Sequence, residues 1–266
     1  MPEAPEIKQY ADDLKDFFNN NKLVEIKVLS GRYSKHSLPD NLHDLNKLLP
    51  LKITNINTKG KFIYITLENN FILAFTMGLS GFFTTDIIKH NHIQFISDKG
   101  SIFMNDVRNF GTFDIYKNFD KLNKKLNKLG PDIFDISEHQ FIDIIKSGSK
   151  YSIGEFLMKQ EKIAGIGNYL RAEILWLSKI NPFKKVKSLS DNDIKIIYLN
   201  SKKLVWYFYD YIQGKNNNII SKNDKFPIDY DRDYFAYQEK KDIYNNEIIT
   251  DTLGNRTIHY APNYQK

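Results

Sequence analysis

Two short stretches of the 266-residue chain hold the residue types best suited to chemistry. The first is the opening MPEAPEIKQY, in which Pro2 and Glu3 follow the initiator methionine and a second Pro-Glu pair comes three residues later. The second is GIGNYLRAEILW, where Gly165 and Gly167 permit a tight turn with free amides. A helix that starts near Asn168 then presents its positive end and its N–H groups, which suit an anion. An ordinary corner between two helices explains these glycines equally well.

The composition is that of a soluble globular protein, and its charge suits a polyanionic partner. Lys and Arg outnumber Asp and Glu 38 to 32, which gives a net charge of +6. A solvated basic surface is the plainer alternative. The absence of cysteine excludes disulfides, thiolate zinc sites and cysteine nucleophiles. No apolar run approaches the roughly 20 residues of a membrane span, and the start lacks the order of a signal peptide. We therefore expect an intracellular protein.

The first half of the chain is predicted to form one helix followed by a set of strands. Apolar residues from Ile7 to Phe18 recur at helical spacing and stop at the asparagines 19–21. Short β-rich stretches separated by turn residues then predict an antiparallel sandwich or barrel that ends near Tyr116. These stretches are KLVEIKVLS, LKITNINT, KFIYITLE, FILAFTM, HIQFIS, SIFMND and GTFDIY.

The second half has helical periodicity after Gly130. Ser137 with Gln140 and Ser152 with Glu155 form capping patterns, and residues 191–212 predict one long buried helix. The tail predicts a β-hairpin from the runs DIYNNEIIT and NRTIHYA around the turn TLGN. The polar stretch 213–225 predicts a mobile loop.

A family resemblance joins these features. GIGNYLRAEIL closely resembles the helix–two-turn–helix signature of the Fpg/Nei family, the formamidopyrimidine-DNA glycosylases and endonuclease VIII-like enzymes, especially the eukaryotic Nei-like branch. MPEAPE, MGLSG, KHNHI, DVRNFG and LGPD resemble further motifs of that family, in family order. The resemblance implies a two-domain α+β fold: an N-terminal helix plus antiparallel β-sandwich over 1–130, and a helical helix–two-turn–helix domain over 131–234. A β-hairpin finger without zinc follows over 235–266.

The resemblance also gives the opening residues a chemical role. It implies removal of Met1, so that Pro2 becomes a free secondary amine. This amine attacks C1′ of a damaged nucleoside and displaces the base, giving a Schiff base. The iminium stays cationic at every pH and acidifies the C2′ proton, so elimination of the 3′ phosphate and then of the 5′ phosphate follows. For a protein without this resemblance, Pro2 would be no more than a neighbour of a helix cap.

The resemblance adds Glu3, Lys61 and Arg256 to Pro2 as the predicted catalytic set, with Glu6 as a structural residue near the site. Glu3 would protonate the sugar ring oxygen and shuttle the C2′ proton, provided that burial raises its pKa toward neutrality. Glu6 would pin the helix start or the surroundings of the nucleophile. Lys61 matches a lysine that in the family lies on an early strand and holds the phosphate beside the lesion, and Lys59 competes for this assignment.

A wedge must fill the gap that an everted nucleotide leaves in the duplex, because eversion costs a few kcal/mol of stacking. The resemblance assigns this wedge to Leu79, Arg108 and Phe110, which would recover stacking and hydrogen-bond the orphaned base. Leu79 stands where the family has methionine, and Val107 and Asn109 replace a proline and a second arginine. These departures leave the preference for the opposite base open.

The second half is expected to hold DNA phosphates. Asn168 would bind phosphate through its side chain and neighbouring amides, and Arg256 would grip the phosphates that flank the lesion through a bidentate fork. Arg171 and Glu173 would brace the helix. The usual zinc finger of the family needs cysteines, so we expect a hairpin held by packing of Ile243, Ile248, Ile258 and Tyr260.

The prediction is a bifunctional DNA glycosylase and AP lyase without cofactor or metal. Its expected partner is double-stranded DNA that contains oxidised bases or abasic sites, with single-stranded DNA as a second candidate. We expect a monomer that acts in the nucleus or wherever viral or cellular DNA lies. The Nei-like motif favours oxidised pyrimidines and formamidopyrimidines over 8-oxoguanine. The alternatives are a damaged-DNA-binding protein that has lost the chemistry, and an RNA-binding module.

Overall fold

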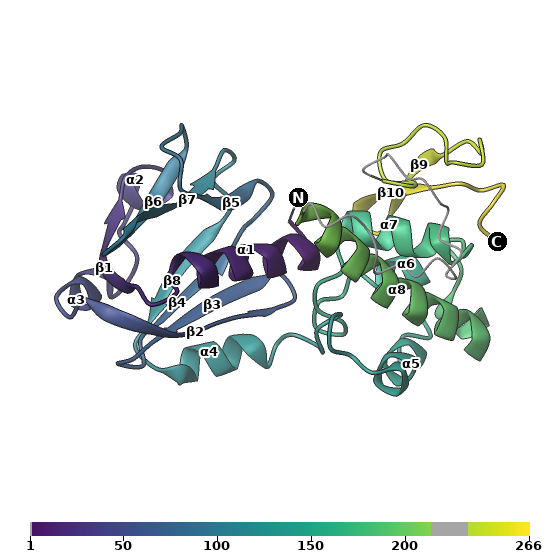
Figure 1. Ribbon diagram of the computed structural model, residues 1–266. Helices are drawn as coiled ribbons and strands as arrows, with labels where there is room; N and C mark the ends of the chain where they lie inside the picture. Colours follow the sequence, from purple (N-terminus) through teal and green to yellow (C-terminus); the bar gives the residue numbers. More distant parts are fainter. Residues whose placement is uncertain (1, 214–233) are drawn as a thin grey trace. The chain divides into compact units, whose positions relative to one another are not determined.

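The structure is a computed structural model that describes residues 2–213 and 234–266. The chain divides into two compact units, residues 1–128 and residues 129–266. Figure 1 shows sheet and flanking helices in the first unit, and helices with a small hairpin in the second. The predicted α+β class, with an antiparallel sandwich followed by a helical domain, is confirmed. The predicted division of the second unit near residue 234 stays a prediction.

Within residues 2–128, the described part of the first unit, the chain forms four helices and eight strands. The helices are α1 (Ala4–Phe17), α2 (Arg32–Lys35), α3 (Leu42–Asn46) and α4 (Phe119–Leu126). The strands are β1 (Lys22–Val28), β2 (Leu51–Lys59), β3 (Phe62–Leu67), β4 (Ile72–Thr76), β5 (Gly81–Thr84), β6 (Asn91–Ser97), β7 (Gly100–Asp106) and β8 (Thr112–Tyr116). All are antiparallel to their neighbours, in the order β5-β7-β6-β1-β2-β3-β4-β8.

The sheet folds over into two layers at the short β1–β2 pairing, which joins only two residue pairs. Aromatic rings fill the space between the layers. Phe75 of β4 stacks on Phe113 of β8 in one layer and meets Phe95 of β6 edge to face, at a centroid distance of 5.6 Å, in the other. Such edge-to-face pairs add to the free energy gained by burying the rings.

The predicted first helix is confirmed as α1. Proline at its first turn suits helix initiation because its φ angle is already helical and its missing N–H has no partner there. The helix ends where the asparagines begin, and Asn20 takes a left-handed φ of 58°. Ile7, Ala11 and Leu14 form its buried face, which packs on the sandwich beside β2 and β3.

Seven of the eight strands follow the predicted stretches, and β5 was missed because its four residues GFFT are too few to show an alternation of buried and exposed side chains. The burial patterns explain why the others were visible. β6 alternates strictly between buried and half-buried side chains, as expected for a strand with one face toward water. The first four residues of β4 are buried on both faces, since α4 packs on its outer side.

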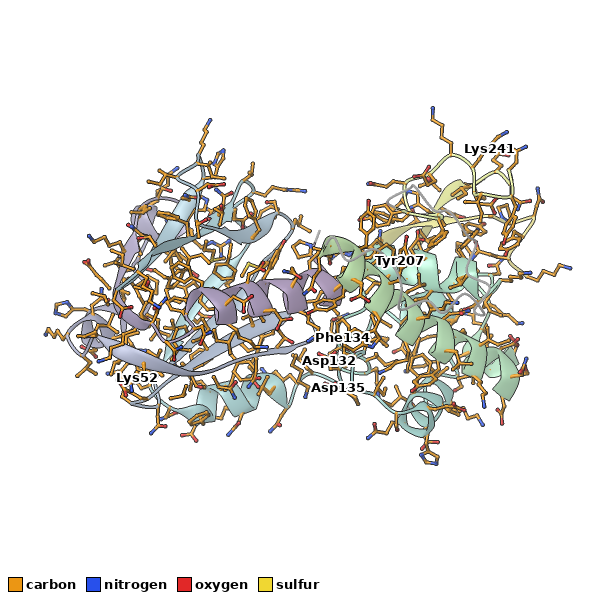
Figure 2. The ribbon with its side chains drawn as sticks, in the orientation of Figure 1. Lys52, Asp132, Phe134, Asp135, Tyr207 and Lys241 are labelled. Atoms are coloured by element: carbon orange, nitrogen blue, oxygen red, sulfur yellow. The ribbon has the colours of Figure 1, made fainter. Side chains whose placement is uncertain are left out.

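The second unit is built around helices α5 (Glu138–Lys146), α6 (Ile153–Phe156), α7 (Asn168–Leu177) and α8 (Asp191–Ile212), with the short 3₁₀ turn η1 (Val186–Ser188) between the last two. Both predicted capping patterns are confirmed, at Ser137 for α5 and at Ser152 for α6. The predicted long helix is α8, and Figure 2 shows its Tyr207, whose ring centroid lies 6.2 Å from that of Phe235. The predicted loop 213–225 lies, apart from its first residue, outside the described residues.

The predicted hairpin is confirmed as β9 (Ile249–Leu253) and β10 (Arg256–Tyr260). Its first strand starts seven residues later than expected. The reason is Asp242, whose carboxylate accepts hydrogen bonds from the backbone amides of Tyr244 and Asn246 at 2.9 and 2.8 Å. An aspartate that bonds amides just ahead of it closes a turn in place of a strand. Among the described residues, no helix is both long and apolar enough to cross a membrane.

Candidate functional site

Pro2 and Glu3 lie directly before α1, and both are buried. Glu3 is the N-cap residue of α1, with 0 % of its surface exposed. Its backbone N–H belongs to the peptide that joins it to Pro2, and this N–H donates to Oε2 of Glu6 at 2.8 Å. Glu6 thereby ties the chain start to the first helical turn, as the structural role predicted for it requires. The burial on which the predicted role of Glu3 depends is also present.

The two candidate lysines differ in their surroundings. Lys59, at the end of β2, donates through Nζ to the carbonyl of Leu126 at 3.0 Å. Because Leu126 ends α4, this ammonium sits at the negative end of a helix and has a structural task. Lys61 lies in the turn between β2 and β3 and not on a strand, because Gly60 with φ of 57° turns the chain there. It is half-buried, and its ammonium makes no hydrogen bond or ion pair with the described residues. This favours Lys61 over Lys59 as the lysine that binds the phosphate.

The three predicted wedge residues come together on two adjoining loops. Leu79 lies in the loop 77–80, and Arg108 and Phe110 lie in the loop 107–111. The loops touch through backbone: a Cβ added to Gly78, whose φ is 57°, would lie 2.7 Å from the amide nitrogen of Gly111. The Arg108 guanidinium lies over the Phe110 ring at 5.1 Å, and Phe110 is 52 % exposed. An exposed ring capped by a cation is suited to contact another flat group.

The sequence did not indicate the residue that holds these loops together. Asp106 is 1 % exposed at the end of β7. Its carboxylate accepts from the Ser80 hydroxyl at 2.5 Å, from the Gly111 amide at 2.7 Å and from the Arg108 amide at 3.2 Å. The Ser80 hydroxyl oxygen also accepts from the Arg108 amide, at 3.0 Å. A buried carboxylate needs such donors, and these come from both loops. The only sequence signal was its place at the head of DVRNFG.

The glycine turn before α7 is present as predicted, with Gly165 at a φ of 111° and α7 starting at Asn168. One part of the prediction is wrong, because not all amides of this turn stay free. The Gly165 amide donates to the side-chain oxygen of Gln160 at 3.0 Å. The side-chain nitrogen of Gln160 donates to the Ile166 carbonyl at 2.6 Å, so this glutamine stiffens the turn from within. An anion at this turn would therefore meet the start of α7 and not Gly165.

Arg256 is the first residue of β10, at the tip of the hairpin. A cavity of about 240 Å³ lies beside it in the second unit. The wall includes Lys159 and Arg171 as well as Arg256, with Glu155 as the acid. Three cations against one carboxylate make this cavity favourable for an anion.

The predicted bracing role of Arg171 and Glu173 takes a specific form. All eight residues from Tyr169 to Trp176 are buried, so charged side chains on α7 need partners. The Glu173 carboxylate accepts from three consecutive amides of residues 235–237, at 2.8, 2.9 and 2.7 Å. Burial raises the pKa of Glu173 to about 7, although these three hydrogen bonds favour its ionised form. The brace therefore fixes the finger segment as well as the helix.

The finger is also held by apolar packing. Ile258 and Tyr260 are in its core, as predicted, together with Leu253 and Ala172. Ile248 is buried outside this cluster, and Ile243 is only half-buried. A zinc ion does not fit these residues, because the chain has no cysteine and no three His, Asp or Glu side chains gather in 2–213 or 234–266.

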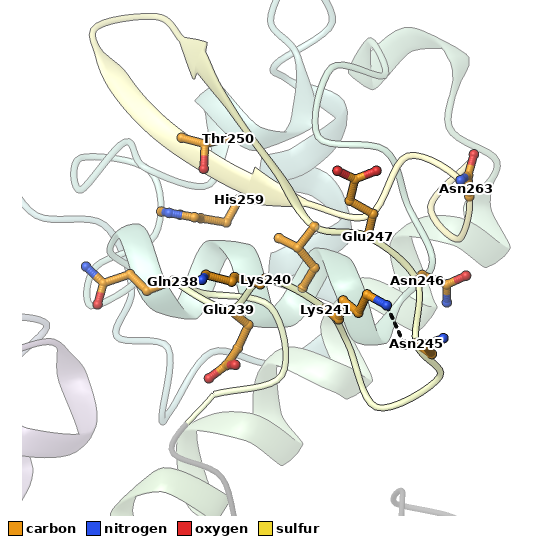
Figure 3. Close-up of a pocket in the computed structure, with 11 residues that line it drawn as sticks. Gln238, Glu239, Lys240, Lys241, Asn245, Asn246, Glu247, Thr250, His259 and Asn263 are labelled. Carbon is orange, nitrogen blue, oxygen red and sulfur yellow. Dashed lines mark hydrogen bonds between the residues drawn. The ribbon is translucent and has the colours of Figure 1, made fainter.

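Figure 3 shows a larger, open pocket of about 1100 Å³ on the finger, with Lys240, Glu247 and His259 on its wall. Lys241 and Asn245, which also line it, are joined by a hydrogen bond of 2.9 Å. None of the predicted site residues lines this pocket. Its acids and bases also balance, with two glutamates against two lysines, which gives no preference for an anion.

Fold and site together define a two-domain α+β protein with a helix–two-turn–helix motif. The family model of the formamidopyrimidine-DNA glycosylase N-terminal domain matches residues 1–113, and that of the H2TH domain matches residues 129–206. Curated relatives include formamidopyrimidine-DNA glycosylases of Oceanobacillus iheyensis, 29% identical over 100% of this chain and 98% of the relative, and of Mycoplasma genitalium, 30% identical over 100% and 96%. The chain belongs to the formamidopyrimidine-DNA glycosylase family.

Solved structures agree with this assignment at the level of the fold. The Lactococcus lactis formamidopyrimidine-DNA glycosylase, crystallised non-covalently bound to DNA with an AP site, matches with a TM-score of 0.80 at 21% identity over 100% of both chains. The MutM (Fpg) protein of Thermus thermophilus matches with a TM-score of 0.80 at 18% identity, over 99% of this chain and 98% of that one. Membership of the zincless Nei-like branch stays a prediction.

Proposed function

We propose that the chain is a bifunctional DNA glycosylase and AP lyase that acts through the amine of Pro2. After removal of Met1, this nitrogen attacks C1′, the bond from C1′ to the base breaks, and the base leaves with a proton. Glu3 protonates the ring oxygen as the sugar opens to the iminium. Loss of the C2′ proton then expels the 3′ phosphate, and a second elimination expels the 5′ phosphate.

One observation carries this proposal: Glu3 is fully buried at the residue next to Pro2, and Glu6 fixes the peptide between them. Family membership supports it, because the relatives are named formamidopyrimidine-DNA glycosylases. A carboxyl group hidden from water beside a free amine is suited to proton transfer at the sugar. Leu79, Arg108 and Phe110 would fill the gap left by the everted nucleotide, while Asn168, Lys61 and Arg256 would hold its phosphates.

Borohydride trapping tests the chemistry. Mature protein with duplex DNA that contains an abasic site is expected to give a covalent adduct, because borohydride reduces the iminium to a stable amine. A form that keeps Met1 is expected to abolish the adduct, because the Pro2 nitrogen is then part of a peptide bond. Pro2→Ala leaves a primary amine at the same place and is expected to reduce the yield of the adduct. Pro5→Ala is the matched control, since Pro5 lies three residues further along in the same opening stretch and is expected to leave trapping intact. An adduct that still forms while Met1 is retained would refute the proposal.

The main rival is a protein that binds damaged DNA without chemistry, which the same fold and wedge would allow. It predicts binding to the abasic duplex with no adduct under any condition. An RNA-binding module predicts instead that structured RNA displaces the duplex. Affinity for duplex DNA is expected to fall steeply with salt, because the excess of lysine and arginine releases counterions from phosphates.

The expected substrates are oxidised pyrimidines and formamidopyrimidines in double-stranded DNA. A panel of duplex and single-stranded oligonucleotides, each with one lesion, tests this order of preference. The size of the products separates β-elimination from β,δ-elimination. Faster excision of 8-oxoguanine than of any oxidised pyrimidine would contradict the proposed preference.

A further inference from the structure

Arg171 is a buried guanidinium that joins three elements of the second unit. It lies on α7 one turn after Asn168 and is 1 % exposed. It donates to the carbonyl of Gly154 in α6 at 3.3 Å, to the carbonyl of Thr257 in β10 at 2.8 Å, and to Oδ1 of Asn168. Its partners therefore include Asn168 itself and the residue next to Arg256.

The contact with Arg171 fixes the orientation of the side-chain amide of Asn168. The two ends of an asparagine amide look alike in shape, so their assignment follows from the hydrogen bonds. A guanidinium has donors and no acceptor, so the atom of Asn168 that faces Arg171 must be the carbonyl oxygen. The Nδ2 end, with its two N–H donors, is left for another partner. Within the described residues Nδ2 makes no hydrogen bond, and Asn168 is half-buried.

The contact with Thr257 acts on the other predicted phosphate ligand. A carbonyl held at 2.8 Å fixes the backbone one residue from Arg256. The side chains of Arg171 and Arg256 share the wall of the 240 Å³ cavity, and Lys159 is on the same wall. One buried group thus fixes the start of α7 and the start of β10 at the same time.

We propose that Arg171 is a positioning residue for DNA phosphates: it turns the Asn168 amide so that Nδ2 faces the phosphate, and it sets the strand that carries Arg256. This rests on the proposed function, because Asn168 and Arg256 are its phosphate ligands. Being buried, Arg171 acts through these two residues and does not touch DNA.

Asn168→Asp separates this role from a merely structural one. The change keeps an acceptor for Arg171 and makes it a carboxylate, so the melting temperature is expected to stay the same or to rise. It replaces the Nδ2 donor by an oxygen, which repels phosphate. We expect at least a tenfold rise in Kd for a duplex with tetrahydrofuran, a stable abasic analogue. Binding equal to that of the wild type would overturn the proposal.

A double-mutant cycle tests the coupling. In Arg171→Lys, a single ammonium cannot serve all three acceptors, so the amide of Asn168 loses its fixed orientation. Asn168→Ala is expected to raise Kd about tenfold in the wild-type background and less than threefold in the Arg171→Lys background. Equal factors in both backgrounds would show that Arg171 does not act through Asn168.

Two further readings keep the outcomes distinct. Single-turnover rates of the Arg171→Lys protein at saturating DNA are expected to stay within twofold of the wild type, while KM rises; a fall in rate without a rise in KM would contradict a role in positioning phosphate. A wild-type protein that binds the tetrahydrofuran duplex but forms no borohydride adduct with a duplex that contains a true abasic site would refute the proposed chemistry and leave the cycle valid. If Arg171→Lys does not fold, Asn168→Asp alone decides.

Discussion

The wedge loops of the first unit and the hairpin of the second are both fixed by a buried charge, but in opposite ways. Asp106 accepts from donors in two loops that strand pairing of β5 with β7 already places side by side. Arg171 donates to acceptors 3, 17 and 86 residues away. A two-stranded hairpin is marginally stable alone, whereas a wide sheet supports its own loops. The hairpin therefore needs long-range attachment, and the wedge needs only local adjustment.

The largest expected effect on stability comes from breaking the long-range attachment of the hairpin segment. Glu173→Ala removes the acceptor of three amides in residues 235–237, of which those of Phe235 and Ala236 are buried and that of Tyr237 is part-buried. Each unsatisfied buried donor costs about 1–3 kcal/mol, so the two buried amides alone are expected to cost the second unit about 2–6 kcal/mol of unfolding free energy.

Urea unfolding followed by tryptophan fluorescence measures this loss, because both tryptophans, Trp176 and Trp206, lie in the second unit. Trp176 also donates to Asp242 at 3.0 Å and so reports on the finger. Glu161→Ala, at an exposed acid of the same unit, is the matched control and should change stability by less than about 0.5 kcal/mol. A loss below about 1 kcal/mol for Glu173→Ala would show that the finger is attached by packing alone.

The unfolding free energy of the second unit should also depend on pH through Glu173. Burial raises the pKa of Glu173 from 4.5 to about 7, so the folded protein keeps this proton after the unfolded chain has released it. The contribution is fully present below about pH 4.5, falls as the pH rises toward 7, and is lost above that; it amounts to roughly 3 kcal/mol. The measurement is urea unfolding at intervals from pH 4.5 to 8, with Glu173→Gln as the variant that cannot titrate. Equal slopes in both proteins would assign the effect to other groups.

The smallest effect is expected at the wedge. In Asp106→Asn, one carboxylate oxygen becomes an NH₂ group, which cannot accept a hydrogen bond from the amides or the hydroxyl that face it. The change is expected to lower the unfolding free energy of the first unit by about 1–3 kcal/mol. Hydrogen exchange of the Arg108 and Gly111 amides measures it directly. Ser80→Ala removes a single bond of the same carboxylate and should cost less. Slowed exchange in Asp106→Asn would contradict the role assigned to this carboxylate.

The sequence predicted elements whose signals are local. The apolar spacing of α1, the alternation in β6 and the capping serines of α5 and α6 each specify an element without help from distant residues. The short strand β5 and the late start of β9 escaped prediction, because β5 is defined by its pairing with β7 and β9 by the turn at Asp242.

The same distinction applies to the site. The family motifs pointed to Leu79, Arg108 and Phe110, and the structure places them on adjoining loops. They did not reveal that Asp106 bonds both loops, because a hydrogen bond across 26 residues leaves no periodic signal. The brace through Arg171 was visible only as a charge on an apolar helix.

The attachment of the finger by separate hydrogen bonds has a consequence for how the protein can change. A metal-centred finger loses all its ligands at once when the ion departs. Here the contacts of Arg171, Glu173 and Asp242 are chemically independent, so each can be weakened without releasing the others. Single substitutions can therefore weaken the attachment of the hairpin to the rest of the second unit in steps.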